Sequence, residues 1–405
     1  MHSPSSPTRL LFAAHSAERG GAEYCLQTTL RHLDRQRFDP LVIFPWEGPM
    51  VEATRSLGIE TRIESMCHWL YFDKNGWYWR QLLGRSWQHV RQLAELIRRE
   101  HIELVYTNTS AIFEPALAAR LTGVPHLWHI HEVLRPGNAM SQLFPLRWMQ
   151  RMIRRHADQV VFESQAARAV FAGTTPLSAA AVVYNSLRFD PQPLPAARLA
   201  ETRARGNLKP GGWTILYVGQ FIDRKNPALI LEALARLPSD LPVQACLIGE
   251  GPLEPALRAE IARRQLGERV RLVPFQEDIQ PWLAAADVLV LPSRQESFGL
   301  VLVEAGAMGK PVIACRCQGP CEIIVDGETG WLVEQDDAIG LATRLQQLID
   351  SPAEACRMGA AARRRIAACF SPETNTRRLE HLMLGLLRRP PNHPVPAPSL
   401  DAQHD

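Results

Sequence analysis

The sequence of 405 residues lacks any long hydrophobic run. No apolar stretch approaches the roughly 18 residues that a membrane-spanning helix requires, and no secretory hydrophobic segment precedes the first expected strand. Neither export nor membrane spanning is indicated, and we predict a cytoplasmic protein.

The sequence also lacks a charge excess and a metal-binding cysteine pattern. The net charge is only +3, and opposite charges are interspersed, which does not favour nucleic acid as a partner. Eight cysteines are scattered, and the cluster Cys315, Cys317 and Cys321 has neither a Cys-x2-Cys pair nor a nearby histidine. We expect reduced cysteines and no zinc at this cluster.

Alternating strand and helix patterns, by contrast, run through most of the chain. A hydrophobic content of 46% supplies enough material for two cores. Residues 1–187 and 213–370 are predicted to be two α/β domains with parallel sheets, joined by a linker over 188–212 that is rich in Pro, Gly and charge. The strands of the second domain are expected near residues 214–218, 243–248, 270–273, 287–291 and 311–314.

Two further segments follow the second domain. Residues 371–388 carry a helical pattern, and residues 389–405 have no apolar period. We therefore predict a final helix followed by a disordered tail.

The most informative segment for function begins where a short buried strand ends at Leu291. A loop follows, and the apolar pattern predicts a helix over Phe298–Met308. The backbone N–H groups of Ser297–Leu300 would lie at the positive end of that helix, which suits a diphosphate. Glu296 and Glu304 flank this position, and carboxylates accept hydrogen bonds from hydroxyls such as those of a nucleotide sugar.

The segment PSRQESFGLVLVEAGAMGKPVIA resembles the Glu-x7-Glu signature of the retaining glycosyltransferase family 4. That family has the GT-B architecture, in which two Rossmann-like parallel-sheet domains face across a cleft. The similarity covers most of residues 9 to 385 and implies that the helix over 371–388 crosses back to the N-terminal domain. Further matches, in the expected order, are GGAE at 20–23, HIHE at 129–132, YVGQFIDRKN at 217–226, GEGP at 249–252 and EIIVDGETGWLV at 322–333.

The resemblance implies a role for each matching residue of the donor site. Glu304 would bind the donor ribose, and Glu296 would hold donor-sugar hydroxyls near the reacting carbon. Backbone contacts to the diphosphate or the sugar would come from Ser297, Phe298, Gly299 and Leu300.

The loops after two other strands add donor-site candidates. Lys225 matches the family's donor-phosphate lysine, a point charge able to stabilise the leaving diphosphate. The family often has an arginine where this chain has Gln220, so Arg224 either replaces that cation or points into solvent. Gly249 lies near the family's base-contacting loop, and Glu254 in the place of a third glycine disfavours a dinucleotide-binding dehydrogenase.

In the N-terminal half, Gly20 and Gly21 permit close backbone approach, and the family places this loop in the cleft near the donor phosphates or the acceptor. Glu23 either contacts a ligand or caps the following helix.

The motif HIHE supplies the histidine candidates. His131 stands at the position of the family's cleft histidine, and His129 lies on the same strand face. A neutral imidazole could contact a donor-sugar hydroxyl or orient the acceptor, with Glu132 fixing its tautomer.

Aromatic and basic residues gather between Trp69 and Arg99. This combination suits a bilayer surface or a lipid-linked acceptor. Equally, the aromatic residues can pack a helix onto the N-terminal domain while the arginines face water.

The resemblance implies a retaining glycosyltransferase of cell-surface polysaccharide synthesis, which moves a sugar from a nucleotide-diphosphate sugar to a glycan or lipid-linked acceptor. The catalytic candidates are Glu296, His131 and Lys225. No convincing Asp-x-Asp motif accompanies them, so we expect neither a metal nor another cofactor. The alternatives are a non-catalytic sugar-nucleotide-binding or scaffolding subunit and a GT-B-type epimerase, and contact with the inner face of the membrane through residues 69–99 is a further hypothesis.

Overall fold

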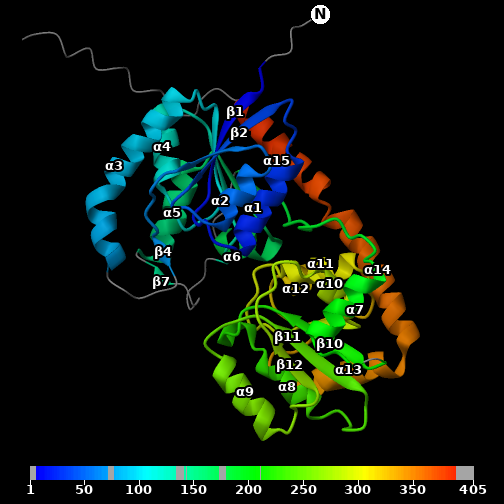
Figure 1. The fold of residues 1–405 in the computed structure, drawn as a ribbon. Coiled ribbons are helices and arrows are strands. Elements are labelled where there is room, and N and C mark those ends of the chain that lie inside the picture. Colours follow the sequence, from blue (N-terminus) through cyan, green and yellow to red (C-terminus); the bar gives the residue numbers. More distant parts are fainter. Residues whose placement is uncertain are drawn as a thin grey trace, which may run out of the picture. The chain divides into compact units, whose positions relative to one another are not determined.

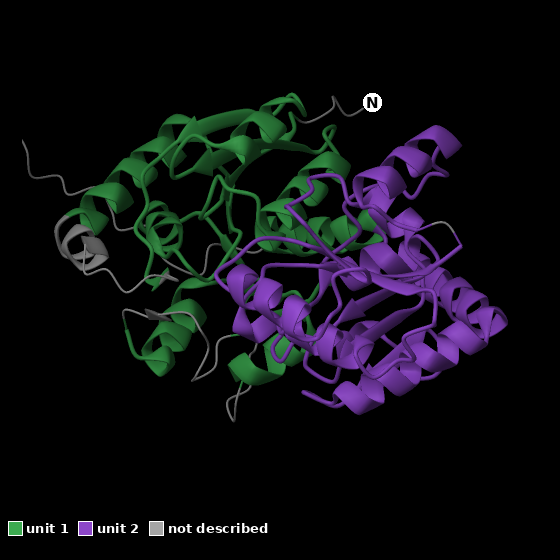
Figure 2. Cartoon of the chain, turned by 60° about the horizontal axis from the view of Figure 1, so that its bottom comes forward, with its two compact units in different colours: residues 1–184, 372–405 green, residues 185–371 purple. Residues whose placement is uncertain are grey.

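The computed structural model describes residues 6–71, 77–133, 141–142, 144–172, 179–209 and 211–388. The chain divides into two compact units, residues 1–184 with 372–405 and residues 185–371 (Figure 2). Helices accompany a parallel sheet in each unit, which confirms the predicted α/β class (Figure 1). The tail over 389–405 lies outside the described residues.

The first unit is built on a seven-stranded sheet with the order β3-β2-β1-β5-β6-β8-β9, and its strand pairs are parallel. The strand order reverses between β1 and β5, and ligands of open α/β sheets collect at the carboxyl ends of strands at such a point. The strands are β1 (Thr8–Ala13), β2 (Phe38–Phe44), β3 (Glu60–Ile63), β5 (Leu104–Thr107), β6 (His126–Ile130), β8 (Gln159–Phe162) and β9 (Ala180–Val182), and a separate antiparallel pair comprises β4 (Leu70–Tyr71) and β7 (Ser141–Gln142).

The C-terminal helix belongs to the first unit and packs on α1. The Asp34 N–H donates to Glu380 Oε1 at 2.8 Å, and Leu379 and Met383 join the core around Phe12. The helices of this unit are α1 (Gly21–His32), α2 (Pro49–Arg55), α3 (Trp77–Arg99), α4 (Glu114–Thr122), α5 (Leu146–His156), α6 (Gln165–Ala172) and α15 (Pro372–Leu387).

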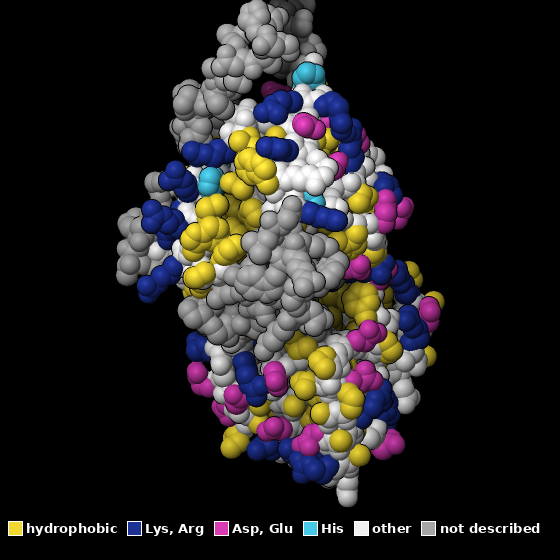
Figure 3. Space-filling model, turned by 90° about the vertical axis from the view of Figure 1, so that its left-hand side faces the viewer, with side chains coloured by type: hydrophobic (Ala, Val, Ile, Leu, Met, Phe, Trp, Pro, Cys, Tyr) yellow, Lys and Arg dark blue, Asp and Glu magenta, His cyan; other side chains and the backbone are white. Residues whose placement is uncertain are grey.

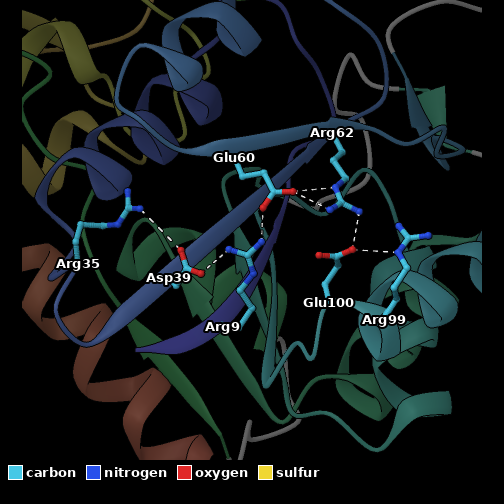
Figure 4. Close-up of polar contacts among 7 residues, drawn as sticks. All are labelled: Arg9, Arg35, Asp39, Glu60, Arg62, Arg99 and Glu100. Atoms are coloured by element: carbon cyan, nitrogen blue, oxygen red, sulfur yellow. Dashed lines mark hydrogen bonds and ion pairs between the residues drawn. The ribbon is translucent and has the colours of Figure 1, made fainter. Parts of the chain in front are cut away.

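A network of ion pairs joins the amino ends of the first three strands to the end of α3 (Figure 4). Arg9 contacts Asp39 at 2.5 Å and also Glu60. Arg62 then bridges Glu60 at 2.7 Å and Glu100 at 2.8 Å. Hydrogen bonds from Arg62 and Arg99 lower the pKa of Glu100. The network lies at the end of the sheet opposite the carboxyl ends of the strands, which indicates a structural role.

The second unit contains a six-stranded parallel sheet with the order β12-β11-β10-β13-β14-β15. Five of its strands lie within a residue or two of the predicted positions, because strands buried on both faces are apolar runs. The sixth, with the sequence GWLV, was not predicted. The strands are β10 (Trp213–Val218), β11 (Val243–Ile248), β12 (Val270–Val273), β13 (Val288–Leu291), β14 (Val312–Cys315) and β15 (Gly330–Val333).

The segment 188–212 differs from the linker that its composition indicates. It belongs to the second unit and carries α7, which packs on α10 with the Arg205 guanidinium 5.8 Å from the Trp282 ring centre. The helices of this unit are α7 (Ala196–Arg205), α8 (Ala228–Leu234), α9 (Glu254–Arg263), α10 (Gln280–Ala285), α11 (Leu300–Ala307), α12 (Pro320–Ile323), α13 (Ala338–Asp350) and α14 (Pro352–Cys369), with one 3-10 turn, η1 (Asp223–Lys225).

Among the described residues, none of the helices combines the length and the apolar character that crossing a membrane would need.

Candidate functional site

Two of the predicted site residues form an ion pair at the carboxyl end of the second sheet. Lys225 ends the loop after β10, and Glu296 lies in the loop after the neighbouring strand β13. The Lys225 ammonium contacts Glu296 Oε2, to which the Ser293 hydroxyl also donates at 3.4 Å. The two charged side chains are only 16% and 9% exposed. A phosphate group could replace the carboxylate as the partner of this lysine, because both are anionic acceptors.

The helix that follows Glu296 begins later than the sequence predicts. α11 starts at Leu300, and Gly299 before it has a φ of +95°, a left-handed conformation that favours glycine. Ser297 and Phe298 therefore belong to the loop, and the apolar pattern misled the prediction because Phe298 is buried without being helical. The first N–H groups of a helix have no acceptor within it, so the positive end of α11 lies at Leu300, although the Leu302 N–H already donates to the Gly299 carbonyl at 2.8 Å.

The backbone of the Glu296 loop is held by Gly319. The Gly319 N–H donates to the Glu296 carbonyl at 2.9 Å, and a Cβ on Gly319 would lie 2.2 Å from the carbonyl oxygen of Phe298. The Phe298 ring meets the Phe370 ring edge-on, with the centres 5.8 Å apart. Phe298 thus packs its ring inside the unit and can offer a ligand only its backbone.

Glu304 is buried and paired with a residue that sequence reasoning missed. Its side chain is 1% exposed, and the Arg188 guanidinium donates to Oε1. Burial raises the pKa of Glu304, and Arg188 opposes that rise. The only available signal was a basic residue directly after the motif VVYNSL, 116 positions before Glu304.

Arg224 is the candidate for a second cation beside Lys225. Arg224 shares the 3-10 turn with Lys225, and its carbonyl accepts from the Arg294 N–H at 2.9 Å. Burial raises the pKa of Tyr217, Glu296 adds to the rise, and Arg224 opposes it. The charges of Arg224 and Glu296 therefore both act on the Tyr217 hydroxyl. Gln220, at the family's arginine position, is exposed.

Gly249 has a structural role that the sequence did not reveal. Its φ is +153°, and a Cβ there would lie 1.9 Å from the carbonyl oxygen of Gly219. A Cβ on Gly251 would likewise lie 2.5 Å from the carbonyl oxygen of Phe221. Both glycines are needed because the loops after β10 and β11 touch through their backbones.

In the first unit, the loop after β1 places a histidine beside Glu23. His15 Nδ1 lies 3.0 Å from Glu23 Oε1. Burial lowers the pKa of His15, but the charge and the hydrogen bond of Glu23, together with the charge of Glu132, outweigh burial and raise that pKa. A Cβ on Gly20 would meet Glu23 Oε2 at 2.4 Å, whereas a Cβ on Gly21 would meet nothing within 4 Å. The buried Glu23 thus has a partner in the partly buried His15, which the sequence did not single out.

His131 is oriented by Asn108, which follows β5. His131 Nε2 donates to Asn108 Oδ1 at 3.1 Å, and His131 Nδ1 lies 3.7 Å from Glu163 Oε2. His129 contacts the Tyr106 hydroxyl instead, and burial, with His131 as a second cause, lowers the pKa of His129 well below its usual range. His129 is therefore neutral and internal.

The prediction that Glu132 fixes the tautomer of His131 is wrong. Glu132 accepts hydrogen bonds from the Thr109 hydroxyl at 2.7 Å and from the Ser110 hydroxyl at 2.6 Å. Strand β6 ends at Ile130, and Glu132 lies at a bend after it, where its carboxylate bonds to Thr109 and Ser110 rather than to His131. Asn108 and Glu163 have the contacts that Glu132 was expected to make.

Two family models match the chain, Glycosyltransferase Family 4 over residues 19–188 and Glycosyl transferases group 1 over residues 200–365. The lipopolysaccharide core biosynthesis glycosyltransferase LpsE of Rhizobium meliloti is 32% identical over 178 residues, which are 44% of this chain and 52% of that protein. The D-inositol 3-phosphate glycosyltransferase of Streptomyces avermitilis is 38% identical over 192 residues, 44% of this chain and 41% of that protein. The chain thus spans about half the length of these relatives.

Solved structures show the same fold. Anabaena Alr3699/HepE in complex with UDP and glucose has a TM-score of 0.80 at 24% identity, with 94% of this chain and 100% of that chain covered. A glycosyltransferase from Rickettsia africae has a TM-score of 0.81 at 19% identity, with coverages of 95% and 100%. The predicted architecture of two Rossmann-like units is confirmed by this likeness.

Proposed function

The chain belongs to the glycosyltransferase family that those two models describe, group 1 and family 4 with the GT-B fold, and we propose that it is a retaining glycosyltransferase. Its donor is a nucleotide-diphosphate sugar bound by the second unit. The observation that carries this proposal is the Lys225–Glu296 pair beside the positive end of α11. This arrangement offers an anion site and a hydroxyl acceptor side by side.

In this mechanism the two members of the pair separate when the donor binds. Lys225 moves its contact from Glu296 to the diphosphate and stabilises the charge that develops as the glycosidic bond breaks. The backbone N–H groups at the start of α11 take part of that charge. Glu296, released from the lysine, accepts hydrogen bonds from the sugar hydroxyls. No carboxylate is assigned as a covalent nucleophile, and retention follows from same-face attack guided by the leaving phosphate.

Glu304 is assigned to the donor ribose. A carboxylate has about four acceptor positions, and Arg188 occupies part of them, so Oε2 can accept from a ribose hydroxyl. Arg188 also supplies a counter-charge to this buried carboxylate and opposes the rise of its pKa.

The first unit is proposed to bind a glycan or lipid-linked glycan acceptor of cell-surface polysaccharide synthesis. The name of the Rhizobium meliloti relative, a lipopolysaccharide core enzyme, supports this acceptor class. Gly20 and Gly21 allow close backbone approach, and His131, held through Nε2 by Asn108, contacts a donor-sugar hydroxyl or orients the acceptor. Catalysis in the cytoplasm follows from the nucleotide-sugar donor.

Peripheral contact with a membrane surface is proposed for α3. Leu93, Leu96 and Ile97 pack inward, whereas Trp87 is 54% exposed with the Arg91 guanidinium 5.8 Å from its ring centre. Figure 3 shows hydrophobic side chains beside lysines and arginines on one face of the molecule. Trp69 does not contribute, because it is fully buried. The aromatic residues between 71 and 79 lie outside the described side chains. Co-sedimentation with anionic vesicles should be lost on Trp87→Ser with Arg91→Glu; equal binding by this variant would contradict the contact.

The decisive experiment measures the products formed from a panel of UDP-, GDP- and ADP-sugars with and without lipid-linked glycan acceptors, by mass spectrometry. We expect one donor to give a transferred sugar with an unchanged anomeric configuration. Release of an isomerised sugar nucleotide without transfer would establish an epimerase instead. Saturable donor binding without any turnover across the acceptor panel would establish a binding subunit, the reading that Gln220 at the arginine position supports.

A further inference from the structure

Three side chains from separate segments of the first unit converge beneath α3. Cys67 precedes β4, His89 lies in the middle of α3, and Glu114 is the first residue of α4. Cys67 Sγ lies 3.6 Å from His89 Nδ1, and Glu114 Oε1 lies 3.9 Å from the same nitrogen. The three atoms lie within 4.8 Å of one another, and among the described residues no other such group of potential ligands occurs.

We propose that Cys67, His89 and Glu114 bind a divalent transition-metal ion, with zinc as the matching element. Thiolate, imidazole and carboxylate are the three ligand types that zinc accepts in proteins. Tetrahedral zinc with ordinary Zn–S and Zn–N bonds separates a sulfur ligand from a nitrogen ligand by about 3.6 Å, and a nitrogen ligand from an oxygen ligand by about 3.4 Å. The Cys67–His89 distance already fits, and the His89–Glu114 distance needs a contraction of about 0.5 Å.

Charge supports a cation at this position. The Glu114 side chain is 0% exposed, and within the described part of the chain His89 is the one basic group recorded within ion-pair distance of it. A buried carboxylate without a full counter-charge is costly, and a bound cation removes that cost. The Cys67 N–H donates to Glu114 Oε1 at 2.8 Å, which fixes the carboxylate beside the thiol.

The geometry argues against a nucleophilic cysteine. In a catalytic triad the histidine contacts the nucleophile through one ring nitrogen and the carboxylate through the other. Here both the sulfur and the carboxylate oxygen face Nδ1 of His89. Convergence on one point is the arrangement of metal ligands.

A cavity beside the three ligands offers a route for the ion and a source of a fourth ligand. It has a volume of about 540 Å³, and of the three ligands His89 is the one that forms part of its wall. The wall is mostly polar and carries both signs of charge, with the carboxylates of Glu64 and Glu95 and the guanidinium groups of Arg85 and Arg99. Three protein ligands with water in the fourth position give four-coordinate zinc with one exchangeable ligand.

The site is separate from the donor machinery, since its ligands belong to the first unit and Lys225, Glu296 and Glu304 belong to the second. Its test therefore does not depend on the proposed transfer reaction. The full chain is freed of metal, loaded with ZnCl2 or CoCl2, and dialysed before the metal content is measured by mass spectrometry. We expect about one ion per chain and a sulfur-to-cobalt charge-transfer absorption, which requires a thiolate ligand.

The variants Cys67→Ser, His89→Gln and Glu114→Gln should each weaken zinc binding by about 100-fold or more, because each removes one of three protein ligands. Cys356→Ser, which alters an exposed cysteine, is the matched control and should bind zinc as the parent chain does. Zinc should also raise the Tm of the parent chain and leave that of Cys67→Ser unchanged.

A parent chain that stays free of zinc after loading would overturn the proposal, and so would equal zinc binding by all three variants. If a variant does not fold, the parent chain decides alone. Absence of the thiolate absorption with cobalt would then show that the three side chains form only a hydrogen-bonded cluster.

Discussion

Arg188 and Glu304 form an ion pair inside the second unit although they lie 116 residues apart in the sequence. Arg188 follows the segment that enters the unit, and Glu304 lies in the middle of α11. The pair ties the start of the unit to the helix whose N-terminus we assign to the donor diphosphate. Stability and donor binding should therefore both respond to this contact.

Arg188→Met should destabilise the chain more at about pH 8 than at about pH 5. Burial raises the pKa of Glu304 above its ordinary value of 4.5, so protonation favours the folded state, and this contribution is lost as the pH rises through the folded pKa. Without Arg188 the carboxylate is buried and unpaired, which costs about 3 kcal/mol where it is ionised. Urea unfolding at the two pH values measures the difference.

Glu304→Gln in the Arg188→Met background is the control for that prediction. It removes the charge while keeping the shape, and should recover most of the lost stability. A cost for Arg188→Met that is equal at both pH values would show that lost packing, rather than a buried charge, is responsible.

Lys225→Ala should lower kcat for sugar transfer by roughly 100-fold, the size of effect that follows the loss of one group stabilising a developing negative charge. Lys209→Ala is the matched control in the same unit, because Lys209 is exposed and pairs only loosely with Glu268, at 3.4 Å. Steady-state kinetics with the preferred donor provide the measurement. Full activity of Lys225→Ala would remove this lysine from the proposed mechanism.

The parts of the fold that depend on local patterns could be predicted from the sequence. Strands such as VLVL at 288–291 are continuous apolar runs because both faces are buried. Helix α7 was hidden by the proline and glycine around it, and its place in the second unit depends on its contact with Trp282 rather than on its own pattern. Packing between distant segments therefore determines that α7 belongs to the second unit.

In the candidate site, too, residues within motifs could be predicted from the sequence, whereas their tertiary partners could not. The motif order placed Lys225 and Glu296 in neighbouring loops, and the structure brings them into contact. The partners Arg188 and Asn108 could not be predicted, because each reaches its glutamate or histidine across tertiary structure. Glu132 was chosen as the partner of His131 because the two are adjacent in the sequence, but at the bend after β6 the Glu132 carboxylate bonds to Thr109 and Ser110 instead.

Gly319→Ala should impair donor binding and also lower the stability of the second unit, because its Cβ would collide with backbone atoms of Phe298. The φ of Gly319 is −63°, which alanine adopts without strain, but its Cβ would meet the Phe298 carbonyl oxygen at 2.2 Å and push the Glu296 loop away. A displacement of this order at a site for reacting groups can cost on the order of 100-fold in kcat/KM.

The matched control is Gly267→Ala, where a Cβ would meet nothing within 4 Å. Kinetics and Tm of both variants separate the two effects. The assignment of Gly319 fails if the two alanine variants have the same kcat/KM.

Transfer should proceed without an added divalent ion, because Lys225 and the N-terminus of α11 supply the charge that stabilises the leaving diphosphate. We expect initial rates with excess EDTA in a short assay to stay within about twofold of those without it, since no step of the transfer needs an ion. If EDTA abolishes the rate and Mg²⁺ or Mn²⁺ restores it, a hard cation at the diphosphate has been missed and the metal-free mechanism is wrong. If only Zn²⁺ restores it, and Cys67→Ser is inactive with or without Zn²⁺, the ion acts through the Cys67 site on the first unit. The choice of restoring ion therefore separates a cation at the diphosphate from an ion at the Cys67 site.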